Sequence, residues 1–150
     1  MYQDWSSKGN SMRDCSKQMK HASDVWNEIF CSKVYQFSSL VPSNLPEKAG
    51  VYVIWLRDTK EVLYVGRTRN MRQRLYTNHL MGNKSSARLK KYLVDDNVNY
   101  PEIVEYSEAK DYIKKNCCVQ FILVEDNNDR GHIEGLLGFL TDARYIEVEH

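Results

Sequence analysis

The sequence has no long apolar run, few glycines and prolines, and no cysteine pair with metal-ligand spacing. No stretch approaches the roughly 20 uncharged apolar residues that a membrane span needs, and the polar N-terminus lacks the apolar core of a signal peptide. With 7 Gly and 3 Pro in 150 residues, the composition shows no low-complexity bias. We therefore expect a protein without a membrane segment that works inside the cell, in the cytoplasm or at the nucleoid.

The four cysteines form no Cys-x-x-Cys pair, and the four histidines do not cluster beside them. Zinc-ligand spacing is therefore missing. This usage predicts reduced structural thiols, as in a reducing compartment. A disulfide between Cys15 and Cys31 is the alternative that the sequence leaves open.

Acidic residues are absent from one whole segment, between Glu61 and Asp95, although 27% of the chain is charged. Eight cations lie in that segment: Arg67, Arg69, Arg72, Arg74, Lys84, Arg88, Lys90 and Lys91. A neutral surface normally intersperses the two signs, so this basic segment on a chain of net charge +1 indicates a polyanion partner. A solvated cationic surface is the alternative.

The length of 150 residues suits one compact domain. Apolar residues at helical spacing predict an amphipathic helix over Met12–Lys33, and a loop rich in serine and proline follows it. We therefore divide the chain into an N-terminal helical extension, residues 1–41, and a domain, residues 42–150. The face of the first helix that carries Trp26 and Phe30 docks on the domain or contacts a partner.

Two runs rich in β-branched and aromatic residues, Val51–Leu56 and Glu61–Val65, predict a β-hairpin. A turn centred on Asp58 would set the pairing and place two tyrosines on one face. The pairs expected are Gly50 with Gly66 and Tyr52 with Tyr64.

Helical spacing predicts further helices after the hairpin, and one apolar run predicts a third strand. In chain order these elements are a helix over Asn70–Leu80, a helix from Ser85 or Ser86 to Leu93, weaker helical character over Ser107–Lys115, a strand over Cys117–Val124 and a helix over Gly131–Thr141. The fold class expected is α/β (α+β), a small sandwich with a three-stranded, mainly antiparallel sheet flanked by helices.

Two short motifs, Gly50-Val51-Tyr52 and Tyr64-Val65-Gly66, place their tyrosines twelve residues apart. A basic helix follows the second motif, and the last helix holds a single acid. Either motif alone occurs often by chance, but the combination resembles the GIY-YIG nuclease family over about residues 42–146. The similarity is greatest to the nuclease domain of the excision-repair enzyme that cuts 3′ of a lesion.

The resemblance implies an endonuclease that binds DNA and depends on Mg²⁺ (or Mn²⁺). Tyr52 would be a catalytic tyrosine, Tyr64 its partner, Arg74 the cation that stabilises the transition state and Glu134 the metal ligand. An arginine can grip two phosphate oxygens at once, and a carboxylate beside an apolar stripe is costly unless a cation binds it. A helix N-terminus that stabilises the charge of Glu134 is the alternative.

Tyr52 has two possible roles. A tyrosine with its ordinary pKa of about 10 is almost wholly protonated at pH 7, so Tyr52 acts as a base only if nearby cations lower that pKa. Otherwise Tyr52 only orients the attacking water.

The DNA-binding surface expected consists of the basic segment and two neighbouring side chains: Arg67, Arg69, Arg72, Asn78, His79, Lys84, Arg88, Lys90 and Lys91. Gly50 and Gly66 would let the phosphate backbone approach closely. Asn78 lies one helical turn after Arg74, where relatives often carry His or Tyr. His79, rotated by about 100°, takes that role only if the helix shifts register.

Ile146 stands where the resemblance leads us to expect an asparagine that organises the site. Together with Asn78, it favours a second hypothesis, a DNA-binding module on the same fold with lost or partner-dependent cleavage. A third hypothesis is an accidental resemblance with a protein partner. Repair, restriction and mobile-element roles stay open.

Overall fold

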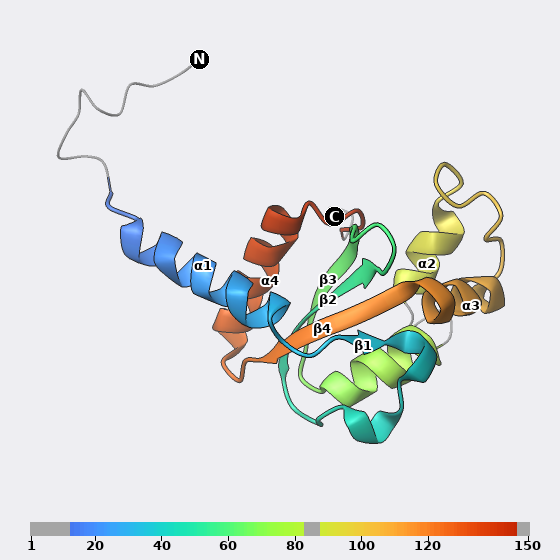
Figure 1. Cartoon of the computed structure of the whole chain (residues 1–150), viewed down its shortest axis with the longest axis horizontal. Helices are drawn as coiled ribbons and strands as arrows, with labels where there is room; N and C mark the ends of the chain where they lie inside the picture. Colours follow the sequence, from blue (N-terminus) through green and yellow to red (C-terminus); the bar gives the residue numbers. More distant parts are fainter. Residues whose placement is uncertain (1–12, 83–87, 147–150) are drawn as a thin grey trace, which may run out of the picture.

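A four-stranded antiparallel sheet in the order β1-β4-β2-β3 forms the centre of the computed structural model, which describes residues 13–82 and 88–146 (Figure 1). Its strands are β1 (Tyr35–Gln36), β2 (Gly50–Leu56), β3 (Val62–Thr68) and β4 (Cys117–Leu123). The predicted α/β sandwich is confirmed, and β1 is the strand that the sequence did not predict. β3 lies at one edge of the sheet.

Alternating side chains of β2 enter two separate cores, because successive residues of a strand point to opposite faces. Val51 and Val53 face the side covered by α1 (Ser16–Phe30) and α4 (Asn127–Thr141). Tyr52 and Ile54 face the side covered by η4 (Gln73–Leu80), α2 (Arg88–Asp95) and α3 (Tyr106–Asn116). Helices on both faces explain why nearly every residue of β2 is buried.

The register of the β2–β3 hairpin differs from the prediction. Gly50 pairs with Thr68 and Tyr52 with Gly66. The turn is centred after Asp58, since the amide of Leu56 donates to the carbonyl of Glu61 at 2.8 Å, and an irregularity between Ile54 and Trp55 shifts the register once more. The expected opposition of the two glycines, and of the two tyrosines, is therefore wrong.

The N-terminal segment joins the same sheet and cores. β1 pairs with β4, and Phe37 and Leu40 lie in the core on the α3 side, although the sequence placed residues 35–40 in the extension. The side-chain amide of Gln120 on β4 donates to the carbonyls of Phe30 and Ser32 at the end of α1. The first helix thus docks on the sheet, as one of the two alternatives expected.

All four cysteines are free thiols, so Cys15 and Cys31 form no disulfide. In the part of the chain that the structure describes, no helix is long and apolar enough to cross a membrane.

The last helix begins earlier than predicted, at Asn127 instead of Gly131. The carboxylate of Asp126 caps it by accepting from the amide of Asp129 at 2.9 Å. Glu134 therefore lies about two turns inside α4, beyond the first turn, where the helix dipole acts most strongly. The dipole alternative for Glu134 is wrong.

The helix after the hairpin also differs, because η4 has π geometry. The amide of Met81 donates to the carbonyl of Tyr76, five residues back, at 2.9 Å. Bonds to the fifth residue widen each turn, so residues five apart approach one side of the helix. Arg74 and His79, which are five residues apart, therefore lie one turn from each other, as the sequence analysis expected of Arg74 and Asn78.

Candidate active site

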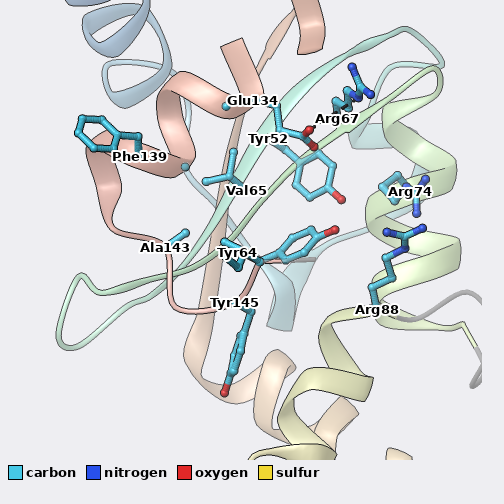
Figure 2. A pocket seen from close by; sticks show the side chains of 13 residues that line it. Tyr52, Tyr64, Val65, Arg67, Arg74, Arg88, Glu134, Phe139, Ala143 and Tyr145 are labelled. Carbon is cyan, nitrogen blue, oxygen red and sulfur yellow. Dashed lines mark ion pairs between the residues drawn. The ribbon is translucent and has the colours of Figure 1, made fainter. Parts of the chain in front are cut away.

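A cavity of about 630 Å³ opens at the β3 edge of the sheet (Figure 2). Side chains from β2, β3, η4, α2, α4 and the segment after α4 line it: Tyr52, Tyr64, Val65, Arg67, Arg74, Arg88, Glu134, Gly135, Gly138, Phe139, Ala143, Tyr145 and Ile146. All four predicted catalytic residues are among them. Four residues that are spread over positions 52 to 134 of the sequence thus line one cavity.

Tyr52 and His79 form a buried pair at the wall of this cavity. The Tyr52 hydroxyl lies 2.7 Å from His79 Nε2, within hydrogen-bond distance. Both side chains are almost fully buried. Burial raises the pKa of Tyr52 well above 10, and Tyr64 adds to this while Arg74 opposes it. Cations therefore do not make Tyr52 a tyrosinate at neutral pH.

His79 is neutral for the same physical reason. Burial lowers its pKa, and the charges of Arg74, Lys90 and Arg88 act in the same direction, so that the pKa falls to about 3. A neutral imidazole has one ring nitrogen free to accept a proton. His79 Nδ1 has no hydrogen-bond partner among the described residues.

Tyr64 completes a cluster of three rings with this pair. Its ring centroid lies 6.1 Å from that of Tyr52 and 5.4 Å from that of His79. Burial raises the pKa of Tyr64, although Arg88 and Arg74 oppose the shift. Its hydroxyl is therefore a neutral donor beside the cavity.

The two motif glycines make room for protein atoms. A Cβ on Gly66 would lie 2.3 Å from the Tyr52 hydroxyl oxygen, and a Cβ on Gly50 would lie 2.2 Å from the carbonyl oxygen of Ile122. Gly66 thus lets the Tyr52 ring lie flat over β3. The space beside these glycines is occupied by the protein, contrary to the expectation that DNA approaches there.

Arg74 and Arg88 supply positive charge beside the tyrosine hydroxyls. Figure 2 shows the hydroxyls of Tyr52 and Tyr64 pointing toward the side of the cavity that carries these guanidinium groups. Arg74 comes from η4 and Arg88 from the start of α2. The buried Nε of Arg74 makes no hydrogen bond within the described residues. The cations therefore face the place where a phosphate would meet Tyr52.

Glu134 projects into the cavity from α4, and Arg67 on β3 lies beside it. Arg67 Nε is 3.7 Å from Glu134 Oε1, and both side chains remain partly exposed. Gly131 makes this possible, since a Cβ there would lie 2.4 Å from Arg67 Nη1. Burial raises the pKa of Glu134, and the Arg67 charge opposes that shift.

The donor set around Glu134 suits a hard divalent cation that keeps most of its water. No group of three or more His, Cys, Asp or Glu side chains that could hold a metal occurs among the described residues. Mg²⁺ commonly binds proteins through one or two carboxylates together with water and substrate phosphate oxygens. A single partly exposed carboxylate in the same cavity as Arg67, Arg74 and Arg88 fits that pattern.

A second cavity, of about 440 Å³, adjoins the first and shares Arg67 and Arg74 with it. Arg69 and Asn78 line it, as do Gln73, Asn127 and Arg130. The predicted DNA-binding residues Arg67, Arg69, Asn78 and Arg88 thus lie at one or the other cavity.

Three other predicted DNA-binding side chains contact the protein. Lys90 is 3% exposed and its Nζ donates to the carbonyl of Gly82 at 2.9 Å, so it does not lie on the expected DNA-binding surface. Arg72 donates to the carbonyl of Leu45 at 2.9 Å and pairs with Glu47. His79 has no exposed surface. Lys91 remains exposed and pairs with Asp95, whereas Lys84 lies outside the described residues.

The sequence missed the contact between His79 and Tyr52, although a signal for it was present. Four-residue steps along the buried side of the helix lead from Met71 to Leu75 and then to His79. A histidine on the buried stripe is a candidate for a specific partner, because a buried polar group needs one.

The segment after α4 closes one side of the cavity. The amides of Arg144 and Tyr145 donate to the carbonyls of Val62 and Leu63 on β3. Tyr145 stacks on Tyr92, and its hydroxyl donates to Asp96 at 2.7 Å. This contact brings Ile146 to the cavity wall, with a side chain that offers no hydrogen bond.

Two tyrosines, a neutral histidine, arginines and a carboxylate around one cavity are typical of an enzyme that acts on a phosphodiester. Residues 48–116 match the family model described as the GIY-YIG catalytic domain. The predicted resemblance to the GIY-YIG nucleases is therefore confirmed over residues 48–116.

A solved structure is also similar, that of the GIY-YIG N-terminal endonuclease domain of UvrC from Thermotoga maritima, a point mutant bound to its catalytic divalent cation. The identity is 15%, the alignment covers 69% of this chain and 88% of that chain, and the TM-score is 0.37. No curated protein matches the chain.

Proposed function

We propose that this chain is a divalent-metal-dependent endonuclease that binds DNA and hydrolyses a phosphodiester bond in the cavity at the β3 edge. The observation that carries the proposal is the buried Tyr52–His79 contact of 2.7 Å beside a cavity that Tyr52, Arg74 and Glu134 line. A hydroxyl, a proton acceptor, a cation and a carboxylate are the groups that this hydrolysis needs.

Tyr52 relays a proton in this mechanism. Because its pKa is raised by burial, the hydroxyl is neutral, and it takes the proton of an attacking water only while giving up its own. His79 Nε2 lies 2.7 Å away and accepts that proton in the tautomer that carries its own proton on Nδ1. The water proton moves to Tyr52 Oη as the Tyr52 proton moves to His79, and no free tyrosinate forms.

His79 becomes a better acceptor when substrate binds. The charges of Arg74, Lys90 and Arg88 contribute to its low pKa. A phosphodiester bound against Arg74 and Arg88 brings a negative charge that opposes their effect. Substrate binding therefore shifts the pKa of His79 upward, toward the range of a useful base.

Arg74 and Arg88 stabilise the charge that accumulates on the phosphate oxygens in the transition state. Guanidinium groups stay charged throughout and bind two oxygens in a fixed geometry. Tyr64 adds a neutral hydroxyl on the same side. These donors are held in place by the fold, so little reorganisation is needed during the reaction.

Glu134 would hold Mg²⁺ or Mn²⁺. A bound divalent cation supplies Lewis-acid stabilisation of phosphate oxygens. Arg67 neutralises Glu134 in part and orients its carboxylate from β3.

A DNA-binding module without cleavage activity is the second candidate. Ile146 favours it, because this exposed apolar side chain lines the cavity where the family resemblance predicts an asparagine.

Plasmid and branched DNA incubated with Mg²⁺ or Mn²⁺ separate the two candidates. We expect nicking by the wild-type protein, strong loss in Arg74→Ala and Glu134→Ala, and retained DNA binding in Glu134→Ala. Unchanged cleavage in Glu134→Ala would refute the metal-ligand assignment. Binding without cleavage by the wild-type protein would establish the module instead.

A further inference from the structure

The cavity has two chemically different halves. Arg67, Arg74 and Arg88 line one side, and Val65, Phe139 and Ala143 line the other, with the tyrosines and Glu134 between them (Figure 2). The cationic half is accounted for by the proposed reaction. The apolar half plays no part in that chemistry.

Phe139 is the most exposed large aromatic side chain among the residues that the structure describes, at 83%. Leaving a phenylalanine in water forgoes the stabilisation that its burial would give. It lies on α4 and lines the same cavity as Glu134.

The floor beside Phe139 is unusually open. Gly135 and Gly138 of α4 line the cavity, and a Cβ on either would meet no atom within 4 Å. Glycine destabilises a helix interior by roughly 0.5–1 kcal/mol relative to alanine. Packing within the chain does not require glycine at these positions, and its effect is to keep the apolar half of the cavity wide.

The cationic and apolar halves belong to one cavity, and this indicates what kind of group the apolar half binds. A phosphate held by Arg74 next to Glu134 carries a nucleoside on each bridging oxygen, and the apolar half of the same cavity can accept one of them. Nucleobases stack on exposed aromatic rings with little sequence preference. A base can present its face to Phe139 only if it is unpaired and displaced from its own stack.

We propose that the apolar half of the cavity, formed by Val65, Gly135, Gly138, Phe139 and Ala143, binds an unpaired nucleobase adjacent to the cleaved phosphate by stacking it on Phe139. The enzyme therefore prefers DNA with an unpaired nucleotide at the cut, such as a flap, bubble or single strand, over intact duplex. This inference rests on the proposed endonuclease function.

The test uses fluorescein-labelled oligonucleotides as a duplex, a five-nucleotide bubble and a single strand, with Mg²⁺ present. Once the cut position is mapped, an abasic site replaces the nucleotide on each side of it in turn. Phe139→Ala should lower kcat/KM on the bubble by about 10-fold or more, the range of base–aromatic stacking. Phe139→Trp should restore it.

The abasic substrate isolates the stacking contact. The wild-type protein should lose activity on one of the two abasic bubbles, and Phe139→Ala should cause no further loss on that substrate. Leu140→Ala, a partly exposed neighbour that does not line this cavity, is the matched control and should behave as wild type.

Four results would overturn the inference. Equal losses with and without the base, or wild-type activity in Phe139→Ala, would show that Phe139 does not stack on a base while leaving the endonuclease proposal intact. Dissociation of a dimer in sedimentation of Phe139→Ala would assign this face to a second copy of the chain. A wild-type protein that cuts none of the substrates would contradict the endonuclease proposal itself.

Discussion

At the scale of single residues, the central feature is a histidine with no exposed surface. His79 contacts the hydroxyl of Tyr52, and cations surround it: Arg74, Lys90 and Arg88 all disfavour its protonation. This environment keeps a proton acceptor buried and neutral next to three cationic side chains. The same environment couples His79 to stability.

We predict that acid destabilises the fold through His79. Its pKa is about 3 in the folded protein against 6.5 ordinarily, so the unfolded chain binds more protons between these values. The stability contributed by neutral His79 is complete above pH 6.5 and is lost as pH falls toward 3. The free energy of unfolding, measured by urea titration, should fall by up to about 1.4 kcal/mol per pH unit from this group.

His79→Gln should flatten this dependence, because glutamine does not titrate. His132→Gln, which replaces an exposed histidine of α4 on the other face of the sheet, is the control substitution. An identical slope in wild type and His79→Gln would show that His79 is not held neutral.

Gly66 provides a second prediction at this scale. Gly66→Ala should displace the Tyr52 ring, lower the free energy of unfolding by about 1–3 kcal/mol and abolish cleavage. Gly135→Ala meets no atom and should raise stability by about 0.5–1 kcal/mol. Thermal unfolding of both variants measures this difference, and a neutral Gly66→Ala would contradict the structure.

The two motifs, the basic helix and the single acid were enough to predict that Tyr52, Tyr64, Arg74 and Glu134 belong to one site. The hydrogen bonds that Lys90 and Arg72 make to backbone carbonyls could not be predicted. A sequence shows the charge of these side chains but not the carbonyls of Gly82 and Leu45 that accept from them.

At the scale of elements, the helix after the hairpin determines which residue meets Tyr52. The prediction followed the four-residue steps from Arg74 to Asn78 and did not follow the steps from Leu75 to the buried His79. The start of α4 was missed for another reason: Asn127, Asn128 and Asp129 favour turns, and only the cap at Asp126 shows that they begin a helix.

Deleting Thr77, an exposed residue of η4, tests the helix register. Removal of one residue converts five-residue bonds to four-residue bonds and should leave His79 against Tyr52. We predict a folded protein whose cleavage rate stays within about 10-fold of wild type, because the contact between His79 and Tyr52 is kept. Losing that contact would lower the rate by about 100-fold or more. In an ordinary α-helix the deletion would rotate the histidine by about 100° and abolish cleavage.

At the scale of the whole molecule, the fold brings side chains from both sides of the sheet together at its β3 edge. Tyr52 and Tyr64 come from the η4 side and Glu134 from the α4 side, and they meet around β3. The order of elements predicted this α/β arrangement. It did not predict β1, because a two-residue strand shows no periodicity.

Salt dependence of DNA binding measures the cationic surface. Four arginines that line the two cavities, Arg67, Arg69, Arg74 and Arg88, predict a slope of log K against log salt near −3 to −4, at about 0.9 per phosphate contact. Arg69→Gln should reduce its magnitude by about 1. Lys90→Gln should lower the free energy of unfolding and leave the salt slope unchanged. A slope that changes in Lys90→Gln but not in Arg69→Gln would show that DNA does not bind at these cavities.

The single-turnover cleavage rate of His79→Gln tests the central claim most directly. With saturating protein, Mg²⁺ and a cleavable bubble substrate, we predict a loss of about 100-fold or more, because proton acceptors typically contribute 10²–10⁴-fold. Asn78→Ala, one residue away, should stay within about 10-fold of wild type. A folded His79→Gln protein that cuts at the wild-type rate would contradict the account.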